Sequence, residues 1–520
     1  MTLGALRTAR LRIYLVLLVC GLSVALGVVR GASIPFWFDE ISTVRIAALP
    51  TWKEAFHGTQ TLDLNPPLEV FLVRASSLVL GWNELAGRLP SILGFALTAG
   101  CLFVFLERRV SPWFAAFGSL LLIQNSEAFY FATEARPYAL LLGMLGLALL
   151  GYDTILEAGR NSVWARLLLL AGISGMLLTH VFAVFPVAAF LMAESLRTVR
   201  LRRIDVLTWL ALLLPLPLCV LYRHLTQTHG TMLFPPVMRV SLAAAIRPYI
   251  YLFLTPVAPV LGAALVVLLL YRGYPESGFF AWLKMPPEEW LLLLTLLATP
   301  VTTALVMFLK DPRSGYFLRY GVAMLYPAFF LLVTWIAWRC RGSAQVGRIL
   351  TLLVLVAIAF SYREIPRQAR HLMHRGWLRA PDEYTSSGGV EKIYPDLPLV
   401  ANDGEDFLEA DNRLSLPDLA RLYYLTDTPT AIRLTQSNAQ EGLLPLRIPF
   451  HVRANLATLG DFTAEHRNFL VIGEIDRSTS WLMKWALEQH ADIRLLGNYD
   501  YAGKVMPLWL VALKPAGTQK

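Results

Sequence analysis

The sequence has few charged residues for its length. Only 16% of its 520 residues are Asp, Glu, Lys or Arg, whereas 56% are hydrophobic, and the mean hydropathy is +0.52. A soluble chain of this length would be expected to form about two to four domains with charged surfaces, and this composition excludes that class. The composition instead predicts a polytopic membrane protein.

Cysteines are also scarce. The chain has four, and all of them fall inside or at the edges of apolar runs. Their positions therefore predict neither a disulfide framework nor a Cys-based metal site. The sequence also contains no internal repeat, no low-complexity tract and no Asn-x-Ser/Thr sequon, and the missing sequon favours a bacterial source.

Basic residues outnumber acidic ones, giving a net charge of +9 and an isoelectric point near 9.4. In a soluble chain this excess would suggest nucleic acid. Here Lys and Arg stand in short clusters between apolar runs, as they do in cytoplasmic loops of membrane proteins, so we predict no nucleic-acid partner. The first run, residues 13–29, is too long for a signal peptide and lacks a cleavage site. We expect an uncleaved helix with a cytoplasmic N-terminus.

Apolar length predicts about eleven transmembrane helices. One more apolar stretch, Pro66 to Trp82, has Arg74 at its centre, where a charge would cost about 2.5 to 3.5 kcal/mol in a bilayer. We predict a surface amphipathic helix there, because that placement puts five later basic sets in the cytoplasm: Arg108-Arg109, Arg160/Arg166, residues 197–203, Arg272/Lys284 and Arg339/Arg341/Arg348. The predicted spans are residues 13–29, 89–106, 112–127, 137–154, 164–179, 181–195, 205–222, 250–271, 289–309, 320–338 and 349–362.

From about residue 363 the apolar runs shorten, and the pattern predicts alternating strands and helices. We expect a buried strand at 468–475, an amphipathic helix at 478–490 and a final strand at 506–515. Because the number of spans is odd, this C-terminal part is predicted to lie outside the cytoplasm.

The predicted fold is a polytopic α-helical membrane protein with a small C-terminal soluble α/β domain. Residues 1–362 form the transmembrane module, with a first outer loop at 30–88, and residues 363–520 form the extracytoplasmic domain. A second long outer connection is expected at 225–246.

Polar side chains gather at the outer ends of the predicted helices. Adjacent carboxylates, Asp39 and Glu40, follow the aromatic cluster Phe36 to Phe38 in the first outer loop. A carboxylate can act as a general base toward a hydroxyl or amine, and Arg or Lys can hold a phosphate. With apolar helices alongside to receive a lipid tail, these features favour an amphipathic substrate that carries phosphate.

Each feature also has a purely structural interpretation. The Asp-Glu pair fits an interfacial aromatic belt followed by a solvated loop, and Arg136 and Arg319 could reach toward lipid headgroups. His180 fits a structural hydrogen bond in a tight turn. Residues 65–67 (Asn-Pro-Pro) fit a helix cap and first turn, and residues 310–313 fit an outer turn.

The order of the motifs is more specific than any one of them. "FWFDE" is followed in turn by "NPPLEVFLVR", "RLPSILGFALT", "ERR", "TEARPYALLL", "LLTHVFAVF" and "FLRYGVAMLYPAF". This series, over residues 12–330, resembles the GT-C superfamily of membrane glycosyltransferases. The resemblance is to the branch with protein O-mannosyltransferases, aminoarabinose transferases acting on lipid A, and related bacterial polyprenyl-phosphate-sugar transferases. It implies a GT-C fold with juxtamembrane helices on the outer surface, and the C-terminal part is similar only to the variable outer domains of such enzymes.

The resemblance implies a bacterial inner-membrane enzyme that transfers a monosaccharide from a polyprenyl phosphate to an acceptor at the outer face, with inversion. It implies Asp39 as the base and Glu40 as a catalytic residue that orients the acceptor or binds a cation. Departure of a phosphate requires cationic stabilisation rather than a protonated acid. Candidate donor-phosphate residues are Arg136, Lys310, Arg313 and Arg319, and candidate substrate contacts are Asn65, Arg74, Arg88, Glu134, Tyr138, His180 and Tyr320.

Several alternatives stay open at this stage. Family members commonly carry His-Pro-Pro where this chain has Asn65-Pro66-Pro67, and Asn has much lower metal affinity, so a divalent cation (Mg or Mn) is neither required nor excluded. The acceptor could be lipid A, another envelope glycan, a membrane lipid or a protein. A flippase for lipid-linked sugars is the alternative function, although flippases distribute polar residues through the bundle. A non-catalytic scaffold is disfavoured by the intact Asp39, Arg136 and Arg319.

Overall fold

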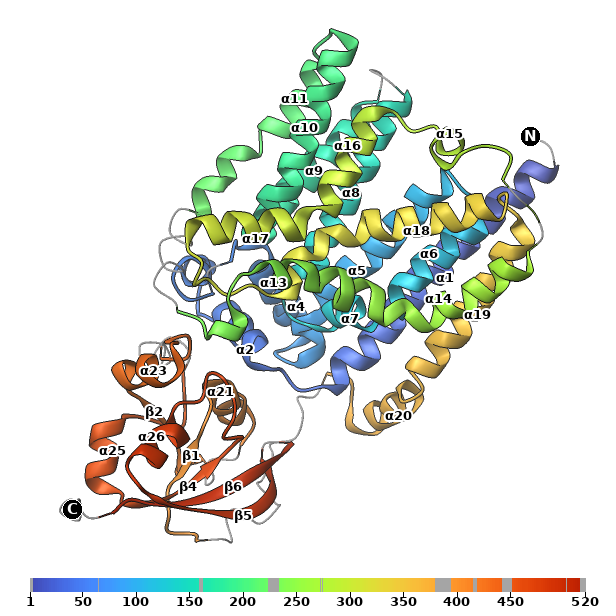
Figure 1. Ribbon diagram of the computed structural model, residues 1–520. Coiled ribbons are helices and arrows are strands. Elements are labelled where there is room, and N and C mark those ends of the chain that lie inside the picture. The colour runs from blue at the N-terminus through green and yellow to red at the C-terminus, as the bar shows by residue number, and fades with distance from the viewer. Residues whose placement is uncertain are drawn as a thin grey trace.

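The computed structural model describes residues 3–63, 65–158, 162–222, 233–271, 273, 275–378, 394–414, 419–441, 451–501 and 503–514. Figure 1 shows a bundle of helices and, beside one of its ends, a smaller domain with a sheet. Residues 225–232 of the second predicted outer connection lie outside the described residues. The rest of that connection contains the short helices η6 (Pro236–Met238) and α13 (Leu242–Arg247).

Among the described residues, seven helices are long and apolar enough to cross a membrane. An eighth candidate is the bent pair α16 (Pro287–Leu297) and α17 (Thr299–Lys310), which meet at 57°. Three shorter apolar helical segments are α6 (Pro112–Gln124), α9 (Val163–Thr179) and Val206–Leu221, which includes α11 (Val206–Leu213) and η5 (Leu216–Leu221). Four of the seven long helices lie within one element each: Ala9–Ser33 in α1 (Leu3–Ser33), Glu84–Glu107 (α5), Tyr138–Glu157 in α8 (Tyr138–Ala158) and Ala344–Ser361 (α19). Two combine two elements: Val181–Leu201 is η4 (Val181–Ala183) followed by α10 (Val184–Leu201), and Leu318–Arg339 is η8 (Leu318–Met324) followed by α18 (Leu325–Arg339). The remaining one, Leu242–Leu270, consists of α13, η7 (Pro248–Leu254) and α14 (Thr255–Leu270).

Each of the eleven predicted spans falls on one of these helical segments, which confirms the prediction of a polytopic α-helical membrane protein. Apolar length alone identified them, because a helix satisfies all of its backbone hydrogen bonds internally and needs only apolar side chains to enter a bilayer.

Small residues let the central helices α5, α8 and α9 pack closely. A Cβ added to Gly94 in α5 would lie 2.7 Å from the Cα of Leu140 in α8, and one added to Gly172 in α9 would lie 2.5 Å from the backbone nitrogen of Ala148. Such contacts are typical of membrane helices, where close backbone approach stabilises the pair. This packing fixes the N-terminal end of α8, which bears the "TEARPY" motif, against α5.

Four short helices form the first outer loop. They are α2 (Phe38–Ala47), α3 (Trp52–Gly58), η1 (Thr59–Asp63) and α4 (Leu68–Leu80). Helix α4 has the same 13-residue length as α6 but, unlike α6, is not among the apolar helical segments described above, which agrees with the predicted surface helix. Arg74 is buried in the protein, however, and its guanidinium donates to the carbonyls of Ala47 at 2.6 Å and Pro50 at 2.9 Å. It therefore anchors the C-terminal end of α2.

The opposite end of the bundle carries ion-paired basic residues in its connections. Arg200 pairs with Glu288 at 2.6 Å, and Arg166 pairs with Asp205 at 2.7 Å. Figure 1 shows the turn between α10 and α11 at this end, away from the C-terminal domain. That this end faces the cytoplasm stays a prediction from the positive-inside rule.

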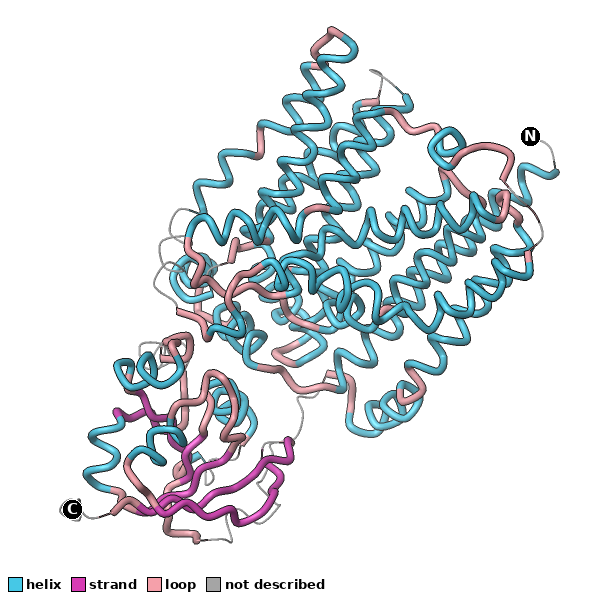
Figure 2. The backbone as a smooth tube through the Cα atoms, in the orientation of Figure 1, coloured by secondary structure: helices cyan, strands magenta, loops and turns pink. Residues whose placement is uncertain are grey.

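The C-terminal domain has a six-stranded sheet in the order β3-β2-β1-β4-β6-β5. Strands β1 to β4 are parallel, and the long β5 and β6 form an antiparallel pair at one edge. Figure 2 shows the strands confined to this domain. The strands are β1 (Leu399–Ala401), β2 (Leu422–Thr426), β3 (Asn455–Thr458), β4 (Asn468–Ile472), β5 (Asp492–Tyr501) and β6 (Lys504–Ala512), with helices α21 (Gly404–Arg413), α23 (Thr428–Thr435), α25 (Leu459–Glu465) and α26 (Leu482–Glu488).

The three elements predicted in this domain correspond to β4, α26 and β6, which agrees with the predicted α/β class. The sequence of strand β4 is a continuous apolar run, because the strand lies between β1 and β6 and is buried on both faces. Helix α20 (Ile365–Arg375) precedes the sheet in sequence but packs against α1 of the bundle.

Candidate active site

Asp39 and Arg319 form an ion pair at the end of the bundle beside the C-terminal domain. Asp39 is in the first turn of α2 and Arg319 is in η8, and the distance between Oδ2 and Nη2 is 3.1 Å. The guanidinium also lies over the rings of Phe317, Tyr138 and Trp37, at 4.8, 5.7 and 5.9 Å from the centroids. The two charged side chains keep 19% and 23% of their surface exposed, so they remain within reach of a ligand.

Glu40, the next residue, has entirely different surroundings. Its carboxylate accepts hydrogen bonds from Arg88 Nε at 2.7 Å and Nη2 at 2.6 Å, and the pair is 0% and 1% exposed. The backbone N–H groups of Ala135 and Trp37 donate to the same carboxylate, at 2.6 and 3.1 Å. These four bonds use the acceptor capacity of the carboxylate.

Arg88 also makes further hydrogen bonds within the protein, because it donates to the carbonyls of Gly31 at 2.6 Å and Pro35 at 3.0 Å. The buried pair therefore ties the end of α1, the start of α2 and the loop before α8 together. A direct catalytic role for Glu40 and a substrate contact for Arg88, both predicted from the sequence, do not fit this burial.

Arg136 lies on the other side of Asp39. Its Nη1 donates to Thr43 Oγ1 at 3.0 Å and to the Asp39 carbonyl at 3.3 Å, and its side chain is buried. The backbone of Arg136 is held by the hydroxyl of Ser91 in α5, which donates to its carbonyl at 3.0 Å. Arg319 thus contacts the partly exposed carboxylate of Asp39, and Arg136 contacts the backbone carbonyl of the same residue.

Glu134 is a buried carboxyl in the same loop, 1% exposed. Burial and the nearby Glu40 carboxylate raise its pKa to about 8, against the opposing effect of the two arginines. The hydroxyl of Tyr130 interacts with it. At neutral pH its acid form predominates, so Glu134 brings a proton donor rather than a second negative charge to the site.

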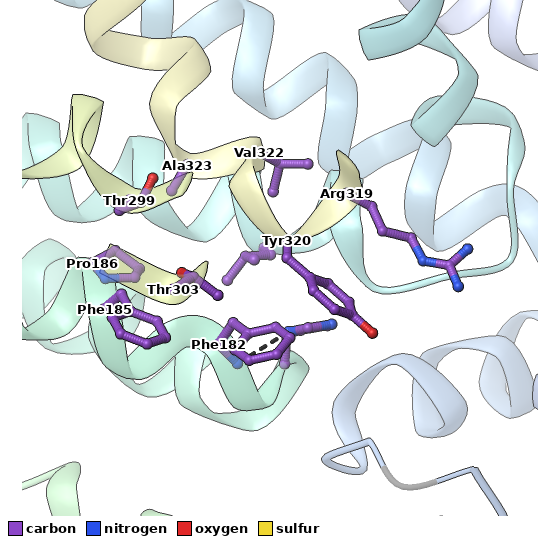
Figure 3. A pocket seen from close by; sticks show the side chains of 11 residues that line it. Phe182, Phe185, Pro186, Thr299, Thr303, Arg319, Tyr320, Val322 and Ala323 are labelled. Atoms are coloured by element: carbon purple, nitrogen blue, oxygen red, sulfur yellow. Dashed lines mark hydrogen bonds between the residues drawn. The ribbon is translucent and has the colours of Figure 1, made fainter. Parts of the chain in front are cut away.

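A pocket begins at Arg319 and Tyr320 and continues between apolar side chains (Figure 3). His180 lies at its polar end, where its Nδ1 accepts from the Phe182 backbone N–H at 3.1 Å and its ring is 5.3 Å from that of Tyr138. The residues lining the pocket are Leu141, His180, Phe182, Phe185, Pro186, Thr299, Thr303, Arg319, Tyr320, Val322 and Ala323. Its lining is polar at one end and apolar along the walls. Its free volume of about 10 Å³ admits one water-sized molecule, so a larger ligand requires the walls to move apart.

Several predicted residues lie elsewhere. Lys310 and Arg313 are exposed, and Arg313 pairs with Asp311 in its own turn at 3.1 Å. Among the contacts of the described residues, neither cation reaches Asp39. Asn65 is buried, but α4 begins at Leu68, so Asn65 does not cap that helix. Arg74 contacts backbone carbonyls of the first outer loop, so its predicted substrate contact does not fit either.

Two buried residues were missed by the sequence reasoning. Thr43 follows Asp39 by four residues on α2 and accepts from Arg136, and this one-turn spacing could have indicated it. Glu69 Oε1 lies 3.2 Å from the Ser91 hydroxyl, whose single proton is shared between Glu69 and the Arg136 carbonyl. No sequence signal distinguishes Glu69 from an ordinary first-turn carboxylate of a helix.

A divalent cation shared by Asp39 and Glu40 does not fit this geometry, because both Glu40 oxygens already accept from Arg88 and backbone N–H groups. Within the described residues, no group of three or more His, Cys, Asp or Glu side chains is arranged to hold a metal ion. We therefore assign no step of the chemistry to a metal.

The C-terminal domain docks on α2 through α21. Arg45 near the end of α2 pairs with the buried Asp411 at 2.9 Å, and Arg413 donates to the Phe36 carbonyl at 2.8 Å. Leu408 packs into a cluster with Phe36 and other buried residues of the first outer loop. The domain thus supports the helix that carries Asp39.

No family model matches the sequence, and no curated protein matches it significantly. Two solved structures of ArnT from Cupriavidus metallidurans match it in fold. One, bound to undecaprenyl phosphate, has 14% sequence identity and a TM-score of 0.50, and the match covers 95% of this chain and 97% of that one. The other, in the apo state, has 14% identity and a TM-score of 0.51, with coverage of 96% and 99%. The match spans bundle and C-terminal domain alike, and it confirms the predicted fold.

Proposed function

Because this chain has the GT-C fold of ArnT, we propose that it is an inverting glycosyltransferase that moves a monosaccharide from a polyprenyl-phosphate carrier to an acceptor at the outer face of the membrane. The observation that carries the proposal is the pairing of Asp39 with Arg319 beside a pocket that is otherwise mainly apolar. The undecaprenyl phosphate bound to ArnT supports the same class of donor for this chain. We assign the protein to a bacterial inner membrane, with its N-terminus in the cytoplasm.

The donor phosphate is assigned to the polar end of the pocket. Arg319 and Arg136 supply positive charge on both sides of Asp39, and guanidinium groups bind phosphate through paired N–H donors. The first part of the prenyl chain would follow the apolar wall formed by Phe182, Phe185 and Val322 (Figure 3). Lys310 and Arg313 are left out of this set, because both are exposed and Arg313 pairs with Asp311 in its own turn.

Asp39 is the proposed general base. In the resting site it is held by Arg319, and an incoming phosphate competes for that guanidinium and leaves the carboxylate available to the acceptor. Asp39 then takes the proton of the acceptor hydroxyl or amine as the acceptor atom bonds to the anomeric carbon. The bond from that carbon to the phosphate oxygen breaks, and its electron pair leaves with the phosphate, where Arg136 and Arg319 stabilise the new charge. One displacement inverts the anomeric centre.

Glu40 has a positioning role in this proposal. Its pair with Arg88 sets the N-terminal end of α2 against α5, so that Asp39 reaches Arg319 at the polar end of the pocket while Glu40 faces the protein interior. Glu134, with its pKa raised to about 8, is assigned as a neutral hydrogen-bond donor beside the reacting groups. Tyr138, His180 and Tyr320 shape the polar end of the pocket.

The function is tested with the full chain in nanodiscs, a panel of radiolabelled polyprenyl-phosphate sugars and a crude envelope extract. We expect label to appear on a lipid, glycan or protein acceptor, which would also identify the acceptor. Liposomes carrying the same donors test the flippase alternative. Donor that binds and crosses the bilayer, but stays intact with every extract, would overturn the proposal in favour of the flippase.

A further inference from the structure

Helix α20 follows directly on α19, which is one of the helices long and apolar enough to cross a membrane. It begins at Ile365, four residues after the apolar helix α19 ends at Ser361, and so cannot be far from the bilayer boundary. Leu372 is fully buried in a cluster with Ala32 of α1, and Arg375 donates to the Ala32 carbonyl at 2.9 Å. Figure 1 shows α20 at the edge of the bundle, at the end where the C-terminal domain lies. One side of the helix is therefore fixed to the protein.

The opposite side of α20 is basic and exposed. Arg367, Arg370 and His374 follow one another at spacings of three and four residues, which places them on one face of the helix. That face is turned away from the buried Leu372. Arg363, just before the helix, adds another exposed guanidinium.

Little negative charge offsets this basic face. From residue 361 to 378 the sequence has one acidic residue, Glu364, against four arginines and two histidines. The carboxylate of Glu364 is 4.0 Å from Arg363, and both side chains are about two-thirds exposed, at 64% and 66%. The remaining guanidinium groups of the exposed face, those of Arg367 and Arg370, are available to an external anion.

Large apolar side chains flank the basic face. Phe360 is 70% exposed and Met373 is 64% exposed, and the Arg363 guanidinium lies 5.2 Å above the Phe360 ring. Apolar groups next to arginines, on a helix that follows a membrane span, are typical of helices that lie in the headgroup region. There the apolar groups enter the acyl boundary while the arginines meet phosphate.

We propose that Arg363 and the exposed face of α20 bind the phosphate groups of anionic phospholipids in the outer leaflet of the surrounding membrane. We infer the occupant from charge complementarity, because guanidinium groups at the depth of the lipid headgroups contact the lipid phosphates. The surface is separate from the donor pocket and does not depend on the proposed reaction. Because α20 is fixed to Ala32, and Arg88 holds the neighbouring Gly31 carbonyl, the bound lipid stabilises the end of α1 that leads into α2.

The test compares lipid retention by the full chain in nanodiscs of mixed phosphatidylglycerol and phosphatidylcholine. Native mass spectrometry counts the phosphatidylglycerol molecules that stay bound to the protein after it is released from the nanodiscs. The variant Arg367→Gln with Arg370→Gln removes two charges from α20, and Arg433→Gln with Arg467→Gln removes two exposed charges from the C-terminal domain as a matched control. We expect the α20 variant to retain at least about threefold less phosphatidylglycerol than the control and the unmodified chain.

Equal retention by the two double variants would overturn the proposal. A thermal-shift titration separates lipid from free anion. Phosphatidylglycerol should raise Tm less in the α20 variant than in the control, whereas inorganic phosphate, which the proposed donor site can bind, should affect the three proteins equally. A rise in Tm with inorganic phosphate that the α20 substitutions abolish would assign the surface to a soluble phosphate compound instead, and would overturn the lipid proposal. The single substitution Arg367→Gln serves if the double variant is not recovered in folded form.

Discussion

The Glu40 carboxylate and the Arg88 guanidinium form a buried two-point ion pair, with N to O distances of 2.6 and 2.7 Å, directly beside the partly exposed Asp39. Consecutive helical residues point about 100° apart. One carboxylate can therefore hold the helix to the protein while its neighbour faces a pocket. Because Asp39 and Glu40 have different roles, we expect substitution of the two residues to have different effects on stability.

Glu40→Gln is expected to destabilise the protein strongly. The change leaves the Arg88 charge buried without its counter-charge, and loss of one partner of a buried pair typically costs about 3 to 5 kcal/mol. Thermal unfolding in detergent measures the loss. Asp39→Asn, at the partly exposed neighbour, should cost less than about 1 kcal/mol. A Tm for Glu40→Gln equal to that of the unmodified chain would contradict the positioning role.

Arg45→Gln is expected to loosen the contact between the C-terminal domain and α2. The substitution removes the partner of the buried Asp411, which costs about 1 to 3 kcal/mol locally. Hydrogen exchange should become faster for the amides of α2 and α21. Arg433→Gln, which breaks an exposed pair with Glu488 in the same domain, is the control and should leave these amides protected. Unchanged exchange in Arg45→Gln would show that the ion pair does not fasten the domain.

Glu134 should make stability depend on pH. Its folded pKa of about 8 lies above the ordinary value of 4.5, so the folded protein binds a proton that the unfolded chain has released between these values. Its contribution to stability is therefore full below about pH 4.5 and is lost as pH rises through about 8. Glu134→Gln, which mimics the neutral acid, should flatten this decline and be more stable at pH 9 by about 1 to 3 kcal/mol. Parallel Tm profiles for the two proteins from pH 5 to 9 would refute the assignment.

Arg319→Ala and Arg136→Ala are expected to weaken donor binding by about 1 to 3 kcal/mol each, because each removes a charged hydrogen-bond donor assigned to phosphate. Arg313→Ala is the matched control, since Arg313 is an exposed arginine on the same outer face and is paired within its own turn. Binding of a polyprenyl phosphate, measured in nanodiscs, should be unchanged in that variant. If all three variants bind the polyprenyl phosphate with equal affinity, Arg136 and Arg319 have a purely structural role.

The sequence was sufficient for the helices and for part of the site. Spans follow from apolar length, which is a local property, and Asp39, Arg136 and Arg319 stand in motifs that the fold brings together. Arg313 was grouped with Arg319 because both stand in the predicted outer connection 310–320, but the turn pairs Arg313 with Asp311. Proximity in sequence does not determine which way an irregular segment directs a side chain.

The remaining features depend on contacts between distant residues. Arg88 reaches Glu40 across 48 positions, and Asp411 reaches Arg45 across 366. No local pattern encodes such pairs. The separation of Asp39 from Glu40 was accessible in principle, because helical geometry turns neighbours to different faces, once the "FWFDE" segment was recognised as the start of a helix.

The most direct test of the account is single-turnover transfer by Asp39→Asn, with donor binding measured in parallel. Asp311→Asn, another carboxylate of the outer face paired with an arginine, is the matched control. We predict that Asp39→Asn still binds donor but forms product at least about 100-fold more slowly, as loss of a general base requires, while Asp311→Asn behaves like the unmodified chain. Transfer by Asp39→Asn within about threefold of the unmodified rate would contradict the assignment of Asp39 as the base.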